Sequence, residues 1–174
     1  GNPKMGGTLN VALHIDFGTL DWQSTVAHPA PQVQSNVWEG LTAYGKDFTA
    51  VPELAESISA SEDGKVWTFN LREGVLFHNL KEMTSDDVVA SIERWQRVGP
   101  KGAALNTTKI EAADKYTVKM YFEEPIGQSL LLLLGSDENK CVIMPAEVCE
   151  ASPTAGTLSE IIGTGPYMWT EYKE

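Results

Sequence analysis

The order of apolar and polar residues predicts the first elements of the chain. Over residues 8–13, apolar residues alternate with polar or small ones, a period of two that indicates a strand. A loop follows at residues 17–21. Over residues 31–41 the apolar positions recur every four residues and a proline opens the segment, which predicts a helix. We expect this helix to pack on the first strand.

Two further segments predict antiparallel hairpins in the middle of the chain. In the first, residues 66–71 and 75–77 are separated by Arg-Glu-Gly, a spacing typical of a hairpin turn. In the second, residues 109–112 and 116–122 flank a three-residue turn, and the later run alternates along its whole length. Each pair is therefore predicted to form a two-stranded antiparallel unit.

Between the hairpins, residues 85–97 have the period of an amphipathic helix. Thr84 and Asp87 form a capping-box pattern at its start, with Asp in place of the usual Glu or Gln. The apolar stripe consists of Val88, Val89, Ile92 and Trp95. We expect Arg94, like Glu93 and Arg97, to project away from this stripe, as on an ordinary amphipathic surface helix.

The last third of the chain predicts short elements. These are a buried helix at residues 129–134, a strand at 142–144 and a helix at 145–151 that begins with proline. An aromatic-rich strand is predicted at 167–172, after the Gly-Thr-Gly-Pro loop at 163–166. Because helices interleave with hairpins, the predicted fold class is α+β (mixed α/β), with antiparallel hairpins and short helices.

Charge and length narrow the possible partners. The 174 residues suffice for one compact unit, and a formal net charge of -11 disfavours nucleic acid or an anionic membrane surface as the partner. No apolar stretch approaches the roughly 20 residues that span a bilayer. The chain does not open with a charged and then apolar signal segment, so we expect any export signal to have been removed or left out.

The residues that usually carry enzyme chemistry are scattered. His14, His28 and His78 lack the two-histidine helical spacing of a zinc site and have no cysteine pair nearby. No Gly-x-Ser-x-Gly motif is present, and the acidic pairs at 86–87 and 123–124 are sequence neighbours that do not face each other on a helix. We therefore expect no catalytic residues, no metal and no cofactor.

Two residue pairs have more than one interpretation. Cys141 and Cys149 are either buried free thiols or a disulfide, and the sequence leaves both open. Gly163 and Gly165 indicate a tight backbone turn rather than a phosphate loop, because no Lys-Ser or Lys-Thr follows and the next element is predicted to be a strand.

The tryptophans divide into two groups. Trp38, Trp67 and Trp95 lie on apolar faces, so we expect them in the core. Trp22 follows the glycine-containing loop, where a ligand could meet backbone groups, and is a candidate for contact with a pocket. A core role for Trp22 stays open.

Eight segments, taken in order, carry a family resemblance. The two most specific are residues 67–78 (WTFNLREGVLFH) and 84–91 (TSDDVVAS). The others are residues 6–9, 20–21, 37–41 (VWEGL), 52–57, 114–118 and 163–167. Together they resemble the family 5 extracellular solute-binding proteins, the dipeptide-, oligopeptide- and nickel-binding components of ABC importers. Asn79-Leu80 departs from the Asp-Gly usual in the family, so the turn there must differ or use Asn79 in a left-handed conformation.

The resemblance implies a fold and a site. The fold is that of a type II periplasmic binding protein, of which this chain would be an N-terminal lobe fragment. Residues 1–44 and 163–174 would be part of the core of lobe I, and residues 45–162 its inserted subdomain. In the family, the near lobe contributes mostly backbone contacts from the loop after the first strand. This loop maps to Phe17, Gly18, Thr19 and Leu20, for which a plain connecting loop is the alternative.

The function implied is transport without a covalent step. A peptide or peptide-like solute would be captured between two lobes and delivered to ABC permease subunits in the membrane, at a periplasmic or other extracytoplasmic location. One alternative is the same family with a nickel chelate, an oligosaccharide or an opine-like compound as cargo. Others are a solute-sensing interaction module and, as the weakest, an enzyme of unknown type.

Overall fold

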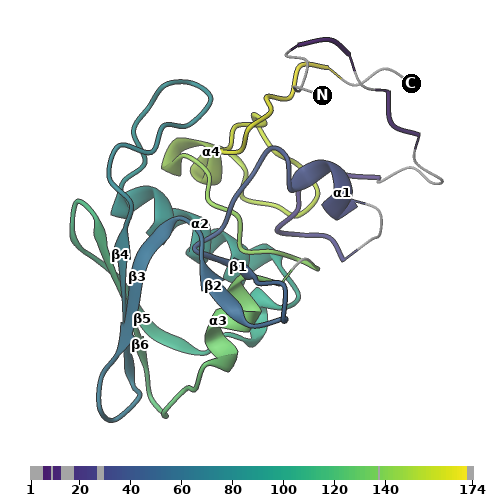
Figure 1. Cartoon of the computed structure of the whole chain (residues 1–174). Coiled ribbons are helices and arrows are strands. Elements are labelled where there is room, and N and C mark those ends of the chain that lie inside the picture. Colours follow the sequence, from purple (N-terminus) through teal and green to yellow (C-terminus); the bar gives the residue numbers. More distant parts are fainter. Residues whose placement is uncertain (1–5, 9, 13–17, 27–29, 137, 172–174) are drawn as a thin grey trace.

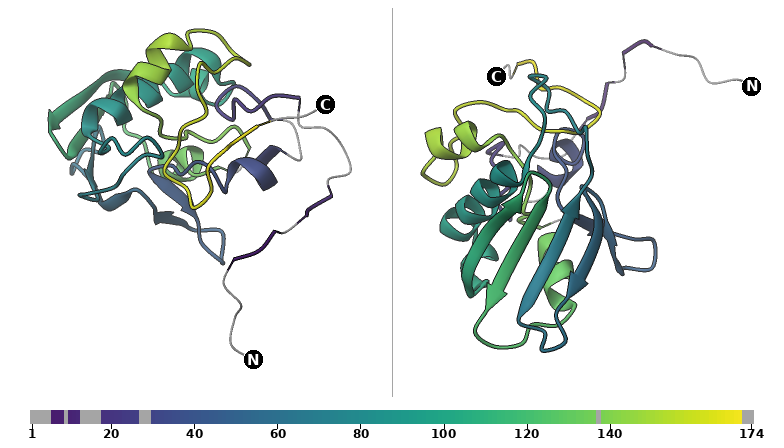
Figure 2. Two further views of the ribbon diagram at one scale, coloured as in Figure 1. Left: turned by 90° about the horizontal axis from the view of Figure 1, so that it is seen from above. Right: turned by 90° about the vertical axis from the view of Figure 1, so that its left-hand side faces the viewer.

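The computed structural model describes residues 6–8, 10–12, 18–26, 30–136 and 138–171. The helices are α1 (Ala30–Gln34), α2 (Ser85–Val98), α3 (Ser129–Leu134) and α4 (Ala146–Ala151), with a 3-10 turn at Gly102–Ala104. The strands are β1 (Thr42–Tyr44), β2 (Ala50–Pro52), β3 (Ala55–Ala60), β4 (Val66–Leu71), β5 (Thr107–Asp114) and β6 (Thr117–Phe122). Figures 1 and 2 show the main sheet with helices gathered on one side of it.

The main sheet has four antiparallel strands in the order β3-β4-β6-β5. Alternate residues of β4 and β6 are buried, because one face of each strand packs into the core. Phe69 of β4 lies opposite Val118 of β6 on that buried face. Helix α2 packs on the strands from the core side, while α3 lies against the small β1–β2 hairpin. The sheet therefore forms one wall of a core that the helices close.

Several predicted elements are confirmed. The β5–β6 hairpin lies where the alternation placed it, and α3 has the predicted bounds. Helix α2 extends one residue beyond its predicted end, and Asp87 accepts hydrogen bonds from the Thr84 backbone N–H (2.9 Å) and hydroxyl (3.1 Å). Pro145 is the N-terminal cap of α4. These elements have strong local patterns, so sequence neighbours alone specify them.

The first predicted hairpin is wrong in its pairing. Strand β4 pairs with β3 and β6, whereas residues 75–77 make only a single bridge, from Leu76 to Glu82, within the described chain. The missed partner, β3, contains a single large apolar residue, Ile58, and lies at an edge of the sheet. An edge strand that buries little apolar surface shows no clear alternation, and its pairing was therefore hidden.

The two ends of the chain also differ from the prediction. Residues 8 and 10–12 do not form a strand, and Val11 is 71% exposed. Residues 167–171 are irregular as well, and α1 is shorter than the predicted helix because turns begin after Gln34. A strand needs a neighbour for its backbone hydrogen bonds, and no described strand lies beside either segment.

The turn at residues 79–80 uses a different residue from the one expected. Leu80, not Asn79, has a positive φ of 68°, and its side chain is exposed. The Asn79 side-chain oxygen instead accepts the Lys81 backbone N–H at 3.1 Å, and the Leu80 N–H donates to the Phe77 carbonyl at 2.8 Å. Hydrogen bonds on both sides hold Leu80 in its strained conformation.

Two apolar clusters form the core. The larger joins the sheet, α2 and α3, and the smaller contains Trp22, Val37, Trp38, Val142, Met144, Val148 and Cys149. The indoles of Trp38, Trp67 and Trp95 are buried as predicted, and each donates to a backbone carbonyl at about 3 Å. Both cysteines are buried free thiols, the first of the two alternatives. Within the described residues, no helix combines the length and apolar character needed to cross a membrane.

Candidate functional site

Residues 18–24 form a loop, called the 18–24 loop below, that contains most of the predicted site residues. Phe17 lies outside the described residues. Gly18 is exposed with a φ of 68°, and Thr19 and Leu20 are half-buried. The side chain of Trp22 is only 1% exposed and packs in the smaller core cluster, so a contact between its indole and a solute stays a prediction.

Local hydrogen bonds give the loop its shape. The Thr19 hydroxyl oxygen accepts the Asp21 backbone N–H at 3.1 Å. Both the backbone N–H and the hydroxyl of Ser24 donate to the Asp21 carbonyl at 3.1 Å. Such turns, closed by Ser and Thr hydroxyls, are common where a chain reverses direction. Asp21 is therefore the centre of the loop.

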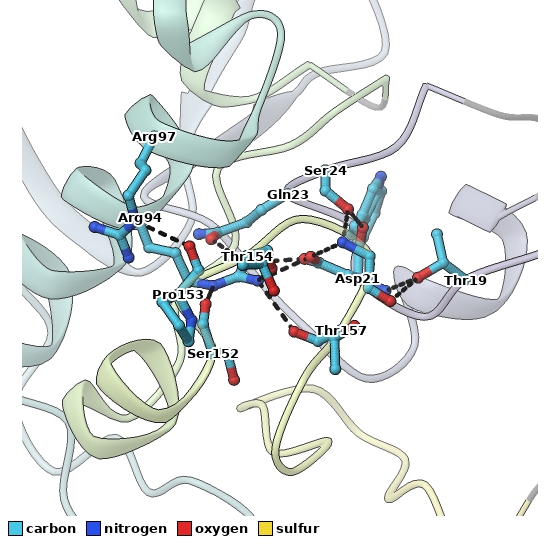
Figure 3. Close-up of polar contacts among 12 residues, drawn as sticks. Thr19, Asp21, Gln23, Ser24, Arg94, Arg97, Ser152, Pro153, Thr154 and Thr157 are labelled. Carbon is cyan, nitrogen blue, oxygen red and sulfur yellow. Dashed lines mark hydrogen bonds and ion pairs between the residues drawn. The ribbon is translucent and has the colours of Figure 1, made fainter.

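A buried ion pair anchors this centre. The Arg94 guanidinium donates to both carboxylate oxygens of Asp21, with Nη1 2.9 Å from Oδ1 and Nη2 2.8 Å from Oδ2. Arg94 is fully buried and Asp21 is 1% exposed. Figure 3 shows the two side chains meeting between α2 and the loop. A bidentate pair of this kind fixes orientation as well as distance.

The remaining donors of Arg94 bind neighbouring segments. Nε donates to the Ser152 carbonyl at 2.7 Å, Nη1 to the Gln23 side-chain oxygen at 2.9 Å, and Nη2 to the Thr154 carbonyl at 3.2 Å. Every N–H of the guanidinium thus has an acceptor, which offsets the cost of removing the charge from water. Arg94 lies off the apolar stripe, as expected, but the expectation of an ordinary surface helix was wrong at this position, because Arg94 is buried on a second face of α2.

A second loop, residues 152–157, closes over the first. The backbone N–H of Gly156 donates to Asp21 Oδ2 at 3.0 Å and to the Ser24 hydroxyl at 2.9 Å, and its carbonyl accepts the Thr19 hydroxyl at 3.1 Å. Gly156 has a φ of 80°, a conformation that side chains rarely allow. One glycine therefore meets three residues of the 18–24 loop.

The interior side of the loop is fixed through Gln23. Its amide nitrogen donates to the Ser91 and Val142 carbonyls, each at 2.9 Å, and its backbone carbonyl accepts the Asn139 amide. The loop therefore has an anchored inner side, formed by Asp21, Trp22 and Gln23, and an outer rim, formed by Gly18, Thr19 and Leu20.

An open cleft of about 850 Å³ lies beside α1. It is lined by residues 6–8 and 11, by one side of α1 and the turn after it, and by residues 167–169. The predicted residues Gly18, Thr19, Leu20 and Trp22 do not line it. Gln34 of α1 connects the two regions, because its amide nitrogen donates to the Thr19 carbonyl at 3.3 Å.

His78 and two glycines hold the segment that leads into the cleft. The His78 Nε2 lies 2.8 Å from the Gly165 carbonyl, and Nδ1 accepts the Gly163 N–H at 3.3 Å. A Cβ atom on Gly163 would lie 2.1 Å from the Val37 carbonyl oxygen. The two glycines are therefore required by close backbone packing, and neither has the positive φ of a left-handed turn.

The two cysteine thiols and the Asp21 carboxylate are buried. Among the described residues, no group of three or more His, Cys, Asp or Glu side chains could hold a metal ion. Burial raises the pKa of the Cys141 and Cys149 thiols, which keeps them protonated and poorly nucleophilic. The Asp21 carboxylate is fully occupied by donors and is shielded from solvent.

Comparison with known proteins identifies the family of the chain. The family described as bacterial extracellular solute-binding proteins, family 5 Middle, matches residues 49–174. The chain belongs to this family. Its members are solute-binding components of transport systems. The match covers the main sheet, α2 and the 152–157 loop, whose Ser152 and Thr154 carbonyls accept hydrogen bonds from Arg94.

Individual family 5 proteins match over most of the chain. The probable D,D-dipeptide-binding periplasmic protein DdpA of Escherichia coli (strain K12) is 32% identical over 173 residues, covering 96% of this chain and 32% of DdpA. Di/tripeptide-binding protein 1 of Pseudomonas aeruginosa is also 32% identical, over 167 residues that cover 79% of this chain and 30% of that protein. The chain thus spans about a third of the length of these relatives.

Solved structures share the fold. The periplasmic binding protein AgaA of A. tumefaciens R10, in complex with agropinic acid, aligns with a TM-score of 0.72 at 32% identity. The alignment covers 89% of this chain and 31% of AgaA. The predicted α+β fold of a type II periplasmic binding protein is therefore confirmed.

The sequence prediction for this family 5 chain missed the second, polar face of α2, which includes Arg94, the anchor of the loop. Asp87, Ser91 and Arg94 form a polar stripe along α2 at helical spacing, and all three are buried. This spacing is visible in the sequence, next to the apolar stripe. It indicates a second packed face, because three polar residues on one side of a helix can bind a segment that covers them. Gly156 has no comparable signal.

Proposed function

We propose that this chain forms part of the first lobe of a solute-binding protein that serves an ABC importer. In this proposal, residues 1–44 and 163–174 contribute to the core of lobe I, and residues 45–162 form its inserted subdomain. A second lobe closes on the solute, and the closed protein delivers it to permease subunits at an extracytoplasmic face of the membrane. Closure follows from the greater affinity of the two-lobed closed state for a bridging solute.

The observation that carries the proposal is the division of the 18–24 loop into an anchored side and an outer rim. Buried hydrogen bonds hold Asp21 and Gln23, while Gly18 is exposed and Thr19 and Leu20 are half-buried. A loop held in this way presents backbone groups to a solute without first having to be ordered. We propose that Phe17, Gly18, Thr19 and Leu20 contact the solute, with Trp22 as a less accessible candidate.

A peptide is the cargo best supported by the relatives. Two of them are named as binding D,D-dipeptides and di- or tripeptides, and together they match most of this chain. The proposal includes no covalent step, because the buried thiols and the paired Asp21 offer no group poised for acid–base or nucleophilic work. The principal partners are then the solute and the permease.

A second candidate cargo has an observation of its own. AgaA is as similar in sequence as the peptide-binding relatives, and its structure holds agropinic acid. An opine-like compound shares a carboxylate with a peptide but lacks the repeated amide backbone. A direct binding test therefore distinguishes the two cargos.

The test is a thermal-shift assay on the mature protein that contains this chain. The probes are the dipeptide Ala-Ala, the tripeptide Ala-Ala-Ala, D-Ala-D-Ala and agropinic acid, with maltose as a sugar control. A solute that binds only the native state stabilises it by about 2.7 kcal/mol at a concentration 100 times Kd. Stabilisation by at least one of the peptides supports the proposal. A response to agropinic acid or maltose alone would overturn the peptide assignment.

A further inference from the structure

We propose that Arg94 is a positioning residue that sets solute affinity through Asp21, without touching the solute. The inference rests on the proposed function, because it assigns a role to the residue beneath the loop that is proposed to contact the solute. Arg94 is separated from Asp21 by 73 positions in the sequence, yet it supplies the main fixed point of the 18–24 loop. Affinity would then depend on a side chain that the solute never reaches.

The contacts of Asp21 show why this single anchor matters. Its two carboxylate oxygens receive three N–H donors, two from Arg94 and one from Gly156. Its backbone N–H and carbonyl bind Thr19 and Ser24. Any movement of the Asp21 side chain is therefore transmitted to the outer rim on one side and to the 152–157 loop on the other.

Thr19, in the outer rim, is tied to Asp21 in two ways. Its hydroxyl binds both the Asp21 N–H and the Gly156 carbonyl, and Gly156 is itself held by the Asp21 carboxylate. The Thr19 carbonyl also accepts a longer bond of 3.3 Å from Gln34, and the side chain of Leu20 packs on the smaller cluster. Loss of Arg94 would therefore loosen both connections between Thr19 and Asp21.

If the rim samples several conformations, the affinity for the solute falls in proportion to the fraction of time that the rim spends in the binding-competent one. If the competent conformation is populated a tenth of the time, the apparent Kd rises about tenfold, although no contact with the solute has been removed. A role limited to overall stability would leave the Kd of the folded protein unchanged. Affinity measured on fully folded protein therefore distinguishes the two roles.

The first experiment measures Kd by calorimetry, using whichever of Ala-Ala, Ala-Ala-Ala and D-Ala-D-Ala the mature wild-type protein binds. The variants are Arg94→Met, Arg94→Lys and the milder Asp21→Asn, which keeps the shape of the side chain. Arg97→Met is the matched control, because Arg97 is an exposed arginine on α2 that binds the Pro153 carbonyl and does not contact Asp21 (Figure 3). All titrations are run at a temperature where circular dichroism shows each variant to be folded.

The expected result is a rise in Kd of about tenfold or more for Arg94→Met and Asp21→Asn. Arg94→Lys should recover only part of the loss, because an ammonium cannot span both carboxylate oxygens and the four other acceptors of Arg94. Arg97→Met should stay within about twofold of wild type, as expected of an exposed polar contact. An unchanged Kd in folded Arg94→Met and Asp21→Asn would overturn the inference.

A second experiment needs no solute. Amide hydrogen exchange is measured at Asp21, Ser24 and Gly156, whose N–H groups close the two loops, and at β4 and β6 as an internal reference. Exchange at the loop amides should accelerate about tenfold or more in Arg94→Met, while the sheet amides change little. Equal acceleration everywhere, or none in the loop, would overturn the positioning role. If the wild-type protein binds no peptide, the peptide assignment fails, and the exchange data still decide the role of Arg94.

Discussion

At the scale of single residues, the closest backbone packing lies at Gly163. The Gly163 backbone packs directly against the Val37 carbonyl, and the Gly165 N–H donates to that same carbonyl at 2.9 Å. His78 binds the segment from the other side. A residue with any side chain would have to move one of these backbones, which explains why glycine is needed there without a positive φ.

Gly163→Ala should therefore destabilise the protein by about 2 to 3 kcal/mol, as expected of an overpacked site. The added Cβ would lie 2.1 Å from the Val37 carbonyl oxygen and 2.6 Å from Cδ1 of Trp38. Gly127→Ala is the matched control, because a Cβ there would have no atom within 4 Å. Urea denaturation gives the free energy of unfolding of each. Equal effects of the two substitutions would show that the close approach at Gly163 is not rigid.

At the scale of elements, α2 has two packed faces with different chemistry. Its apolar stripe lies against the sheet, and its polar stripe of Asp87, Ser91 and Arg94 holds residues 144–154 by hydrogen bonds. Asp87 accepts the Ala146 N–H at 2.8 Å, and the Ser91 hydroxyl oxygen accepts the Met144 N–H at 2.9 Å. The polar stripe thus places α4 and the 152–157 loop.

Ser91→Ala tests this second face. The substitution removes the hydroxyl that accepts the buried Met144 N–H, so the free energy of unfolding should fall by about 1 to 3 kcal/mol. Glu93→Ala, on the exposed side of the same helix, should change it by less than about 0.5 kcal/mol. The two are compared by urea denaturation. A loss at Glu93 as large as that at Ser91 would contradict the assignment of a second packed face.

The elements that the sequence predicted are those specified by neighbours along the chain. The alternation of β6, the capping box at the start of α2 and the proline at the start of α4 are local patterns, and all three were predicted correctly. Strand β3 was missed because an edge strand with one large apolar residue, Ile58, shows little alternation. The anchor of the candidate site was missed because Arg94 meets Asp21 only after the whole chain has folded.

At the scale of the whole molecule, each of the two apolar clusters contains a buried cysteine thiol, and ionisation of that thiol would destabilise the fold. Cys141 lies in the larger cluster and Cys149 in the smaller one, and both are about 98–99% buried. Burial raises the pKa of each thiol. Deprotonation is therefore easier in the unfolded chain than in the native protein, which links stability to pH.

Stability should consequently fall as the pH rises above about 8.5, the pKa of a thiol in the unfolded chain. Because the native pKa is the higher one, the stabilisation is complete below pH 8.5 and is lost as the pH rises toward the native value. The expected slope rises through this range to a limit of about 1.4 kcal/mol per pH unit for each thiol, reached where the unfolded thiol is ionised and the native one is not. Urea denaturation between pH 8 and 9.5, with a reductant present, measures it. The sequence has only these two cysteines, so the Cys141→Ala/Cys149→Ala double variant should lose most of the slope. An unchanged slope in that variant would assign the pH dependence to other groups and would contradict this account of the core.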